Sequence, residues 1–349
     1  MIYFFVTAVL FFAHHATAVT QIDPSIAQAT ITNAEIAGAV IMPALEKNVD
    51  PKKFAQTLCE VHAISYMLLR PDWNKKMIDT IQSEHDALCG QGSGLLIVAI
   101  DAEPSLLKSR MPTLVAQKTS SLTTEKKAYA MAQKIAKKLH DSGVTVTFAP
   151  VYDSNRNKAV IGARSFGSDS KSIISLTRAY VRGTHDAGVY ATAKHFPGHG
   201  MALGDTHTSL QIIPGTLLEL PQFKAAIADA VPFMMVGHLV VKGGEWDSKR
   251  LPASLSPIIM TKLLKDTLHY SGIVITDALN MGAVSNVPTA PLDALVAGAD
   301  IALFPEDVHS AYDMILKKIS TDEKFKMQML QSMQKIKGVQ KNIISIQKI

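Results

Sequence analysis

Residues 272–278 read GIVITDA, a run of apolar and β-branched residues that ends at a single aspartate. A strand that is apolar on both faces must be covered on both faces, which is typical of parallel strands in α/β proteins. Helix-length segments separate such runs, and residues 123–140 form an amphipathic one with a lysine-rich polar face. Eight strand–helix units predict a (β/α)8 TIM barrel. The other seven runs lie at residues 37–42, 64–69, 95–100, 144–150, 189–196, 233–240 and 300–305.

A doubly wound open sheet is the alternative arrangement of such units. That fold would be expected to carry a glycine-rich phosphate turn after an early strand, and the sequence has none there. The barrel also predicts where a site lies, because active sites of this fold form at the C-terminal ends of the strands. Seven polar residues lie at or just past those ends: Asp101, Asp153, Lys194, His195, His238, Asp277 and Glu306.

The composition is that of a globular protein with a large core, because 47% of the 349 residues are hydrophobic and 19% are charged. The net charge of +5 comes from basic residues that are spread along the chain and form no block. Nucleic-acid binding is therefore not indicated.

The first 18 residues, MIYFFVTAVLFFAHHATA, contain a short apolar run followed by small residues at positions 16 and 18. This pattern predicts a signal peptide over residues 1–18 and one catalytic domain over residues 19–349. The protein would then be periplasmic or secreted, whereas a buried strand or retained anchor is the alternative reading and the cytoplasm the alternative location. Export would allow Cys59 and Cys89 to form a disulfide, although two buried thiols fit the sequence equally well.

Residues 193–210, AKHFPGHGMALGDTHTSL, concentrate histidines, glycines and charged residues between two apolar segments. His195 and His199 are four residues apart, a spacing that would place two zinc ligands on one face of a helix. Pro197 and the glycines at 198 and 200 disfavour a helix, and no Glu or Cys follows in ligand spacing. We therefore expect no metal here, and a structural role for His199 in a tight turn.

Asp205 and His207 have the spacing that places two side chains on the same side of an extended loop. The carboxylate could then hold one imidazole nitrogen and leave the other free to exchange a proton with a substrate. The glycines at 198, 200 and 204 are expected to let this loop swing over the barrel mouth as a lid.

Asp277 follows four apolar positions at the end of the seventh run and opens a polar loop. A carboxylate there would point into the barrel mouth, although an N-cap of the next helix is the alternative. With Asp277 as nucleophile and His207 as proton donor, the pair would make a double-displacement glycosidase.

Four motifs together resemble glycoside hydrolase family 3, and specifically its single-domain β-N-acetylglucosaminidases. The resemblance extends from about residue 37 to the C-terminal region. Its motifs are VIGARSFGSD at 160–169, AKHFPGHG at 193–200 with GDTHT at 204–208, LPASLSP at 251–257 and VITDALNMGAV at 274–284.

The resemblance implies a (β/α)8 barrel in which Asp277 is the nucleophile and Asp205 with His207 forms the proton donor. It also implies that charged side chains bind the sugar hydroxyls in the cleaving subsite, as charge-assisted hydrogen bonds allow. The residues expected at the substrate site are Lys194, His195, Arg164, Asp101, Arg110, His238 and Met281.

Three departures from the family pattern bear on these expectations. After the third predicted strand the family reads Asp-x-Glu-Gly-Gly-Arg, whereas this chain reads DAEPSLLKSR at 101–110, so the glycine turn and its arginine are missing. Arg110 is the candidate substitute, about a residue out of register. Ala278 replaces the second aspartate of the nucleophile motif. The soluble wall-recycling members usually have no leader, whereas this chain has the pattern of one.

These observations predict an exported, metal-independent, retaining β-N-acetylglucosaminidase that acts through a covalent glycosyl-aspartate. Its expected partner is a carbohydrate with terminal β-linked GlcNAc, from peptidoglycan fragments or chito-oligosaccharides, with no cofactor and no nucleic acid. The chain is expected to be a monomer. A sugar-binding protein without turnover, a β-glucosidase of the same fold and a phosphorylase are the alternatives.

Overall fold

The computed structural model describes residues 31–90, 94–202, 204–205 and 208–346. The folded unit discussed below begins at Asn33. The predicted signal peptide, residues 1–18, lies outside the described residues.

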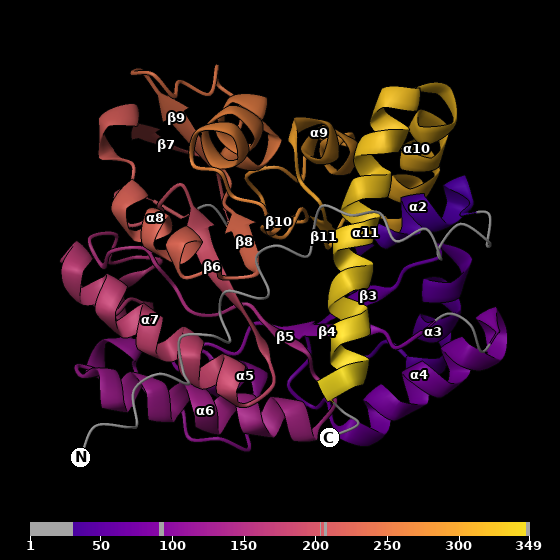
Figure 1. Cartoon of the computed structure of the whole chain (residues 1–349), viewed down its shortest axis with the longest axis horizontal. Helices are drawn as coiled ribbons and strands as arrows, with labels where there is room; N and C mark the ends of the chain where they lie inside the picture. The colour runs from indigo at the N-terminus through magenta and orange to yellow at the C-terminus, as the bar shows by residue number, and fades with distance from the viewer. Residues whose placement is uncertain (1–30, 91–93, 203, 206–207, 347–349) are drawn as a thin grey trace, which may run out of the picture. The chain divides into compact units, whose positions relative to one another are not determined.

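The centre of the unit is a sheet of seven strands, all paired in parallel. Each of the eight predicted runs contains at least one strand, so the α/β class and the strand positions are confirmed. The unit is an α/β fold built on a parallel half-barrel (Figure 1). The strands of the sheet, in spatial order, are β2 (Ala44–Leu45), β3 (Ser65–Leu68), β4 (Ile97–Ile100), β5 (Val146–Thr147), β6 (Tyr190–Phe196), β8 (Phe233–Val236) and β10 (Ile273–Thr276).

Two further strands lie beside the ends of this sheet. β1 (Ile41–Met42) directly precedes β2 in the chain and pairs in parallel with β11 (Ala302–Leu303). On the other side, Ile301, just before β11, forms a parallel bridge with Ile275 of β10. Thus β11 pairs with β1 in a separate two-stranded sheet, and the residue before β11 bridges to the last strand of the seven-stranded sheet.

Helices follow most of the strands and lie on the outside of the sheet (Figure 1). The predicted amphipathic segment 123–140 forms α6 (Glu125–Asp141), which begins where the Thr124 side chain accepts a hydrogen bond from the amide of Lys127. The others are α2 (Asn33–Ala39), α3 (Pro51–Glu60), α4 (Lys75–Cys89), α5 (Leu107–Arg110), α7 (Ser170–Asp186), α8 (Leu220–Ala228), a π-type helix (Ile258–Thr267), α9 (Ala290–Ala297), α10 (Val308–Thr321) and α11 (Glu323–Ile346).

The main core lies inside the curved sheet, where alternate residues of the strands meet in one cluster. Helix α11 covers the N-terminal ends of the strands: Gln340 donates to the carbonyl of Leu95, and Lys335 donates to that of Gly272. Ile336 of α11 belongs to the same buried cluster. The C-terminal ends of the strands are therefore the edge left for a site.

The predicted run 233–240 is two strands. Strand β8 ends at Val236, and β9 (Leu239–Lys242) pairs in parallel with β7 (Gln211–Pro214) in a separate small sheet. The break falls at Gly237, where a Cβ atom would lie 3.2 Å from the Cβ of His195. Gly237 therefore lies close against β6, a contact between distant segments that the run of apolar residues does not reveal.

The only two cysteines form a disulfide. Cys59 in α3 is bonded to Cys89 at the end of α4, with their Cα atoms 5.7 Å apart. This settles the choice that the sequence leaves open between a disulfide and two thiols. Among the described residues, no helix combines the length and the apolar character that a membrane crossing requires.

Removal of this disulfide is expected to lower the free energy of unfolding by about 2–5 kcal/mol, because the bond closes a loop across 30 residues of sequence. Cys59→Ala and Cys89→Ala should each have this effect, and the double variant should lose no more than either, when unfolding by urea is followed. Thiol titration of the unreduced protein should find no reactive cysteine. Two titratable thiols in freshly purified protein would contradict the assignment.

Candidate active site

Several of the polar residues predicted for the strand ends lie together at the C-terminal edge of the sheet. Lys194 and His195 belong to β6, Asp101 directly follows β4, and Asp277 directly follows β10. Because these strands run in parallel in the order β4, β5, β6, β8, β10, their ends face the same side.

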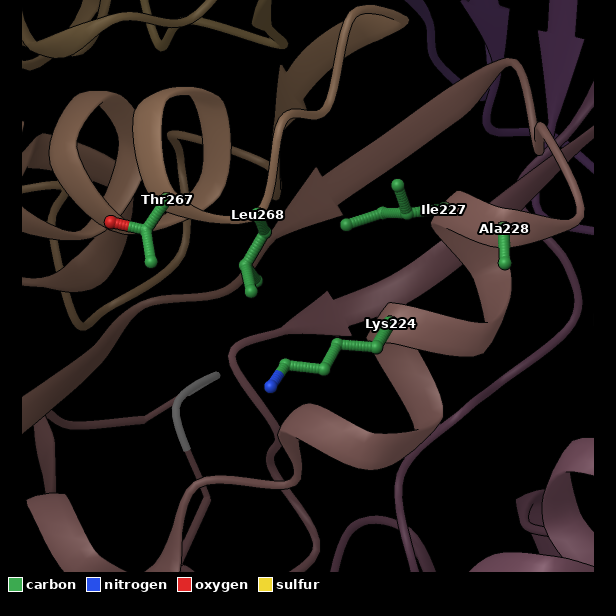
Figure 2. A pocket seen from close by; sticks show the side chains of 5 residues that line it. All are labelled: Lys224, Ile227, Ala228, Thr267 and Leu268. Carbon is green, nitrogen blue, oxygen red and sulfur yellow. The ribbon is translucent and has the colours of Figure 1, made fainter.

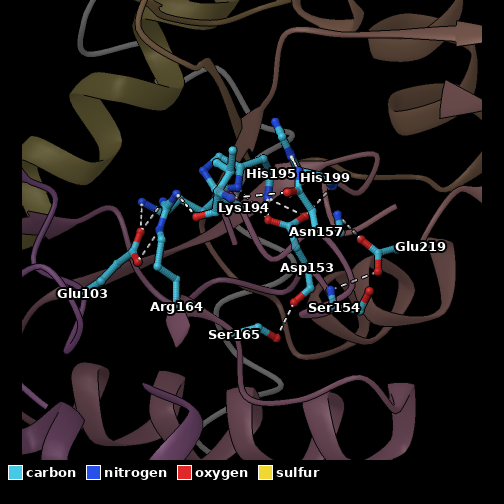
Figure 3. Close-up of polar contacts among 12 residues, drawn as sticks. Glu103, Asp153, Ser154, Asn157, Arg164, Ser165, Lys194, His195, His199 and Glu219 are labelled. Carbon is cyan, nitrogen blue, oxygen red and sulfur yellow. Dashed lines mark hydrogen bonds and ion pairs between the residues drawn. The ribbon is translucent and has the colours of Figure 1, made fainter. Parts of the chain in front are cut away.

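Lys194 is the centre of one buried ionic cluster. Its Nζ lies 2.7 Å from Asp101 Oδ1 and 2.6 Å from Glu103 Oε1, and the residue is only 1% exposed. Arg164 contacts the same glutamate at two points, Nε to Oε2 at 2.9 Å and Nη2 to Oε1 at 2.7 Å. Figure 3 shows Glu103 facing both cations. The cluster holds two cations and two carboxylates at the edge of the site.

Mutual attraction keeps these groups charged. Burial would lower the pKa of Lys194, but the carboxylates of Asp101 and Glu103 outweigh burial and raise the pKa above its usual value. Burial would likewise raise the pKa of Glu103, yet Arg164 and Lys194 hold it well below its usual range. An ammonium and a guanidinium are thus available to hydroxyl oxygens at neutral pH.

A second cluster forms around Asp153, which is fully buried after β5. Its carboxylate accepts from His195 Nδ1 at 2.6 Å, from the His195 amide at 3.1 Å and from the His199 amide at 2.7 Å. Burial would raise the pKa of Asp153, but the charge of His195 and its hydrogen bond lower it. Since an ionised carboxylate can only accept, Nδ1 of His195 carries the proton, and Nε2 is the nitrogen that can face a ligand.

Asp277 is half-buried at the tip of β10. Its amide donates to the carbonyl of Val236 at 2.9 Å, and its Oδ1 accepts from the amide of Ala278 at 2.9 Å. Burial would raise its pKa, but attraction to His195 and His238 outweighs burial and lowers the pKa of Asp277 to about 2. The carboxylate is therefore ionised across the physiological range, as a nucleophile must be.

Both ring nitrogens of His238 are hydrogen-bonded within the protein. It is fully buried, with Nδ1 at 2.6 Å from Ser254 Oγ and Nε2 at 2.9 Å from the carbonyl of Ala278. The carbonyl can only accept, so Nε2 donates to it, while Nδ1 shares a second hydrogen bond with the serine hydroxyl. The geometry favours a role in holding the backbone beside Asp277 over direct contact with a sugar.

The expected proton-donor pair is described only in part. Asp205 is half-buried, and its carbonyl accepts from the amide of Ser209 at 3.2 Å. His207 lies outside the described residues, so its pairing with Asp205 stays a prediction.

The glycines before Asp205 lie close to other residues, whereas the sequence predicted that they let the loop move. A Cβ at Gly198 would lie 2.6 Å from the Cβ of Glu219, and one at Gly200 would lie 2.4 Å from the carbonyl oxygen of Ser154. At Gly204 it would lie 2.4 Å from the side-chain oxygen of Gln211. Positions 198 and 200 need glycine because other atoms occupy the space of a side chain, whereas at position 204 only the end of a flexible glutamine side chain lies in that space.

The remaining predicted residues lie around this centre. Arg110 ends α5, and its carbonyl accepts from Trp73 Nε1 at 2.7 Å. Met281 is buried in the turn after Asp277, where its amide donates to the carbonyl of Ala278 at 3.2 Å. Glu306 is exposed just past β11. Their roles toward a ligand stay predictions.

Two charged residues of the site were missed by reasoning from the sequence. Glu103 could have been found from its position two residues after Asp101, because both carboxylates leave the end of the same strand. Glu219 precedes α8 and contacts residues 65 and 19 positions earlier in the chain. No local pattern signals such contacts.

A hollow elsewhere on the surface lies between α8 and the π-type helix (Figure 2). Its lining residues lie toward the C-terminal ends of these two helices, and each helix is followed by a strand, β8 or β10. The hollow is therefore near the N-terminal ends of the strands, whereas Asp277 lies at a C-terminal end. Lys224 is the one charged residue among those that line it, and the others are Ile227, Ala228, Thr267 and Leu268. This hollow therefore lacks the carboxylates and imidazoles of the site.

Comparisons with known proteins find β-hexosaminidases among the similar sequences. A β-hexosaminidase of Stenotrophomonas maltophilia is 36% identical over 203 residues, which cover 54% of this chain and 59% of that protein. The β-hexosaminidase LpqI of Mycobacterium bovis is 32% identical over 272 residues, which cover 72% of this chain and 68% of the relative. The matched part of this chain thus spans less than two thirds of the Stenotrophomonas protein.

A solved family 3 β-N-acetylglucosaminidase from Paenibacillus sp. FPU-7 superposes with a TM-score of 0.80 at 27% identity. The superposition covers 90% of this chain and 63% of that one. Residues 91–340 match the model of the glycosyl hydrolase family 3 N-terminal domain. The chain therefore belongs to glycoside hydrolase family 3.

Proposed function

We propose that this protein is a retaining β-N-acetylglucosaminidase that removes terminal β-linked GlcNAc. The observation that carries the proposal is the ionised carboxylate of Asp277 at a strand tip, close enough to His195 and Lys194 for their charges to lower its pKa. The named relatives, two β-hexosaminidases and a β-N-acetylglucosaminidase, support the choice of sugar.

In the first step, Asp277 attacks the anomeric carbon while the glycosidic C–O bond breaks. His207, oriented by Asp205, gives its proton to the departing oxygen, so the aglycone leaves as a neutral alcohol. In the second step, the neutral imidazole takes a proton from water, the resulting hydroxide attacks the same carbon, and the bond to Asp277 breaks. Two inversions give net retention, and both side chains return to their initial states.

The sugar would be held by the ionic cluster around Lys194. Lys194 and Arg164 can donate to sugar oxygens, while Asp101, whose side chain is 17% exposed, can accept from hydroxyl groups. Such hydrogen bonds are charge-assisted and hence short and directional. His195 would add a donor or acceptor through Nε2, since Asp153 occupies its Nδ1.

We also propose that the parallel strands form the complete (β/α)8 TIM barrel predicted from the sequence. In support, β11 pairs with β1, bridges to β10, and β1 continues directly into β2 at the far end of the sheet. The main core cluster draws residues from strands along the whole sheet and from β1 and β11, as the interior of a barrel does.

Peptidoglycan fragments or chito-oligosaccharides outside the cytoplasm are the proposed substrates. The disulfide supports export, because such bonds persist in oxidising compartments and are rare in the cytosol. The leader-like sequence of residues 1–18 fits the same location. Fractionation of expressing cells, with N-terminal sequencing of the mature chain, tests export directly.

The experiment that tests the activity compares 4-nitrophenyl β-GlcNAc with 4-nitrophenyl β-glucose, each with water or phosphate as acceptor. We expect GlcNAc to be released faster than glucose, with no sugar phosphate formed. Faster release of glucose would make the protein a β-glucosidase, and GlcNAc 1-phosphate would make it a phosphorylase. Binding of GlcNAc without turnover would make it a sugar-binding protein.

The pH dependence of kcat/KM should reflect the low pKa of Asp277. Because the folded-state pKa is about 2, the nucleophile stays ionised above that pH and is protonated only as the pH falls through about 2. No loss of kcat/KM from this group is expected between pH 7 and 4. An acid limb near pH 4–5 in stably folded protein would contradict the charge arrangement around Asp277.

A further inference from the structure

Glu219 is a buried carboxylate that joins two distant loops of the site. It is 6% exposed and directly precedes α8, but its side chain makes no cap of that helix. Instead Oε1 accepts from the amide of Ser154 at 2.9 Å, and Oε2 accepts from the amide of Gly200 at 2.9 Å. In Figure 3 its carboxylate points at the loop beside His199. Both oxygens are thus used to fix backbone.

Further contacts hold the chain at residues 197–200 beside Glu219. The amide of Glu219 donates to the carbonyl of Pro197 at 3.0 Å. Glu219 is therefore hydrogen-bonded to the same loop at Pro197 and at Gly200. The close contacts of Gly198 with Glu219 and of Gly200 with Ser154 exclude side chains there. The path of the chain through residues 197–200 is therefore fixed from one side by Glu219.

Asn157 fixes the next part of the same loop. Its amide donates to the carbonyl of Gly200 at 2.6 Å, and its Nδ2 donates to the carbonyl of Gly204 at 3.0 Å. Oδ1 of Asn157 in turn accepts from the amide of Ala159 at 3.2 Å, which orients the side chain. Gly204 directly precedes Asp205. The backbone that leads to Asp205 is therefore held at both Gly200 and Gly204.

The position of Glu219 is electrostatically unfavourable. Burial and the negative charge of Asp153 raise the pKa of Glu219, against the two backbone hydrogen bonds that lower it. Two buried carboxylates near each other destabilise a fold unless their hydrogen bonds compensate. An apolar residue would fill the space at lower electrostatic cost, but it could not accept from both amides.

We propose that Glu219, together with Asn157, is a positioning residue for proton donation, because it fixes the backbone from which Asp205 departs. This inference rests on the proposed function. Neither residue contacts the reacting atoms in this account. They act by orienting Asp205. Their substitution should therefore slow the reaction only where the leaving oxygen needs a proton.

The test is the dependence of kcat/KM on the leaving group in Glu219→Gln. A glutamine has one oxygen, so its NH2 group must face one of the two amides and one contact is lost. We expect a loss of about 30-fold or more for N,N′-diacetylchitobiose, whose leaving alcohol needs a proton. For 2,4-dinitrophenyl β-GlcNAc, whose phenolate leaves without one, the loss should be about 3-fold or less. Asn157→Ala should show the same split.

Asp300→Asn is the matched control. Asp300 is another buried carboxylate that accepts from a backbone amide, that of Val274 at 2.8 Å, but it lies at the N-terminal ends of the strands. We expect this variant to lose stability in urea, because a neutral amide removes the ion pairs that the carboxylate makes with Lys335 and Lys265. It should lose chitobiose and dinitrophenyl turnover in equal proportion.

A double-mutant cycle shows whether Glu219 acts through Asp205. If it does, adding Glu219→Gln to Asp205→Ala should lower chitobiose turnover by less than about 3-fold further, since the shared function is already lost. Equal losses on both substrates in Glu219→Gln and Asn157→Ala, or full additivity with Asp205→Ala, would overturn the inference and leave the proposed function intact. A wild-type protein without turnover would overturn both.

Discussion

Asp277→Ala is expected to lower kcat/KM for 4-nitrophenyl β-GlcNAc by about 10^4-fold or more, because in the proposed mechanism its carboxylate forms the covalent bond to the sugar. The carboxylate is held by the amide of Ala278 and kept ionised by its surroundings. The substitution does not alter the ionic contacts of Lys194 with Asp101 and Glu103, which we propose hold the sugar. The affinity for GlcNAc itself should therefore change much less than the rate.

Rescue of Asp277→Ala by azide tests the role of Asp277 more specifically than loss of activity alone. Azide can enter the space left by the missing carboxylate and attack the anomeric carbon of an activated aryl glycoside. The product should be the α-configured glycosyl azide, because a single inversion replaces two. Asp277→Ala that keeps more than about a tenth of the wild-type rate, or an azide product of β configuration, would contradict the assignment.

Asp307→Ala is the matched control for this variant. Asp307 also follows a strand, β11, but its carboxylate caps α10 by accepting from the amide of Ser310 at 3.0 Å. This is the role that the sequence leaves open as the alternative for Asp277. We expect a loss of about 1 kcal/mol in the free energy of unfolding, with unchanged kcat/KM.

His207→Ala is the second variant with a large expected effect. Loss of the proton donor should lower kcat/KM for N,N′-diacetylchitobiose by about 10^2–10^4-fold, the range typical of general acid catalysis. Turnover of 2,4-dinitrophenyl β-GlcNAc should be affected far less in the bond-breaking step, because that leaving group departs as a stable anion. The slope of log kcat/KM against leaving-group pKa should steepen.

The control for this prediction is His309→Ala, which removes an exposed imidazole that pairs with Glu60 at 3.1 Å on the outside of the fold. It should leave both substrates unaffected. A loss in His207→Ala that is equal for disaccharide and dinitrophenyl glycoside would contradict its role as donor. If His207→Ala loses activity but the slope of log kcat/KM against leaving-group pKa does not change, His207 would instead have a role in substrate binding.

The strands and the position of the site could be predicted from the sequence because both depend on local patterns. A strand that is buried on both faces reads as an apolar run, and the carboxylate of Asp277 directly follows such a run. In parallel strands the polar residues after each run must share one edge. Lys194, His195 and Asp101 were therefore placed together correctly without any knowledge of their contacts.

The contacts that organise the site could not be predicted because they join segments far apart in the chain. Asp153 fixes the imidazole of His195 across 42 residues of sequence, and Glu103 pairs with Arg164 across 61. The glycines at 198 and 200 illustrate the same limit. In the sequence they indicate freedom, whereas the structure shows that Glu219 and Ser154 occupy the space beside them.

Trapping of the intermediate tests the central claim, that Asp277 is the nucleophile, most directly. A 5-fluorinated GlcNAc donor with a good leaving group should form the glycosyl-enzyme quickly and release it slowly, so that intact mass rises by one sugar. Peptide mapping by tandem mass spectrometry should then place the label on Asp277. A label on any other residue, or steady turnover of the donor with no labelled protein at any time, would contradict the account.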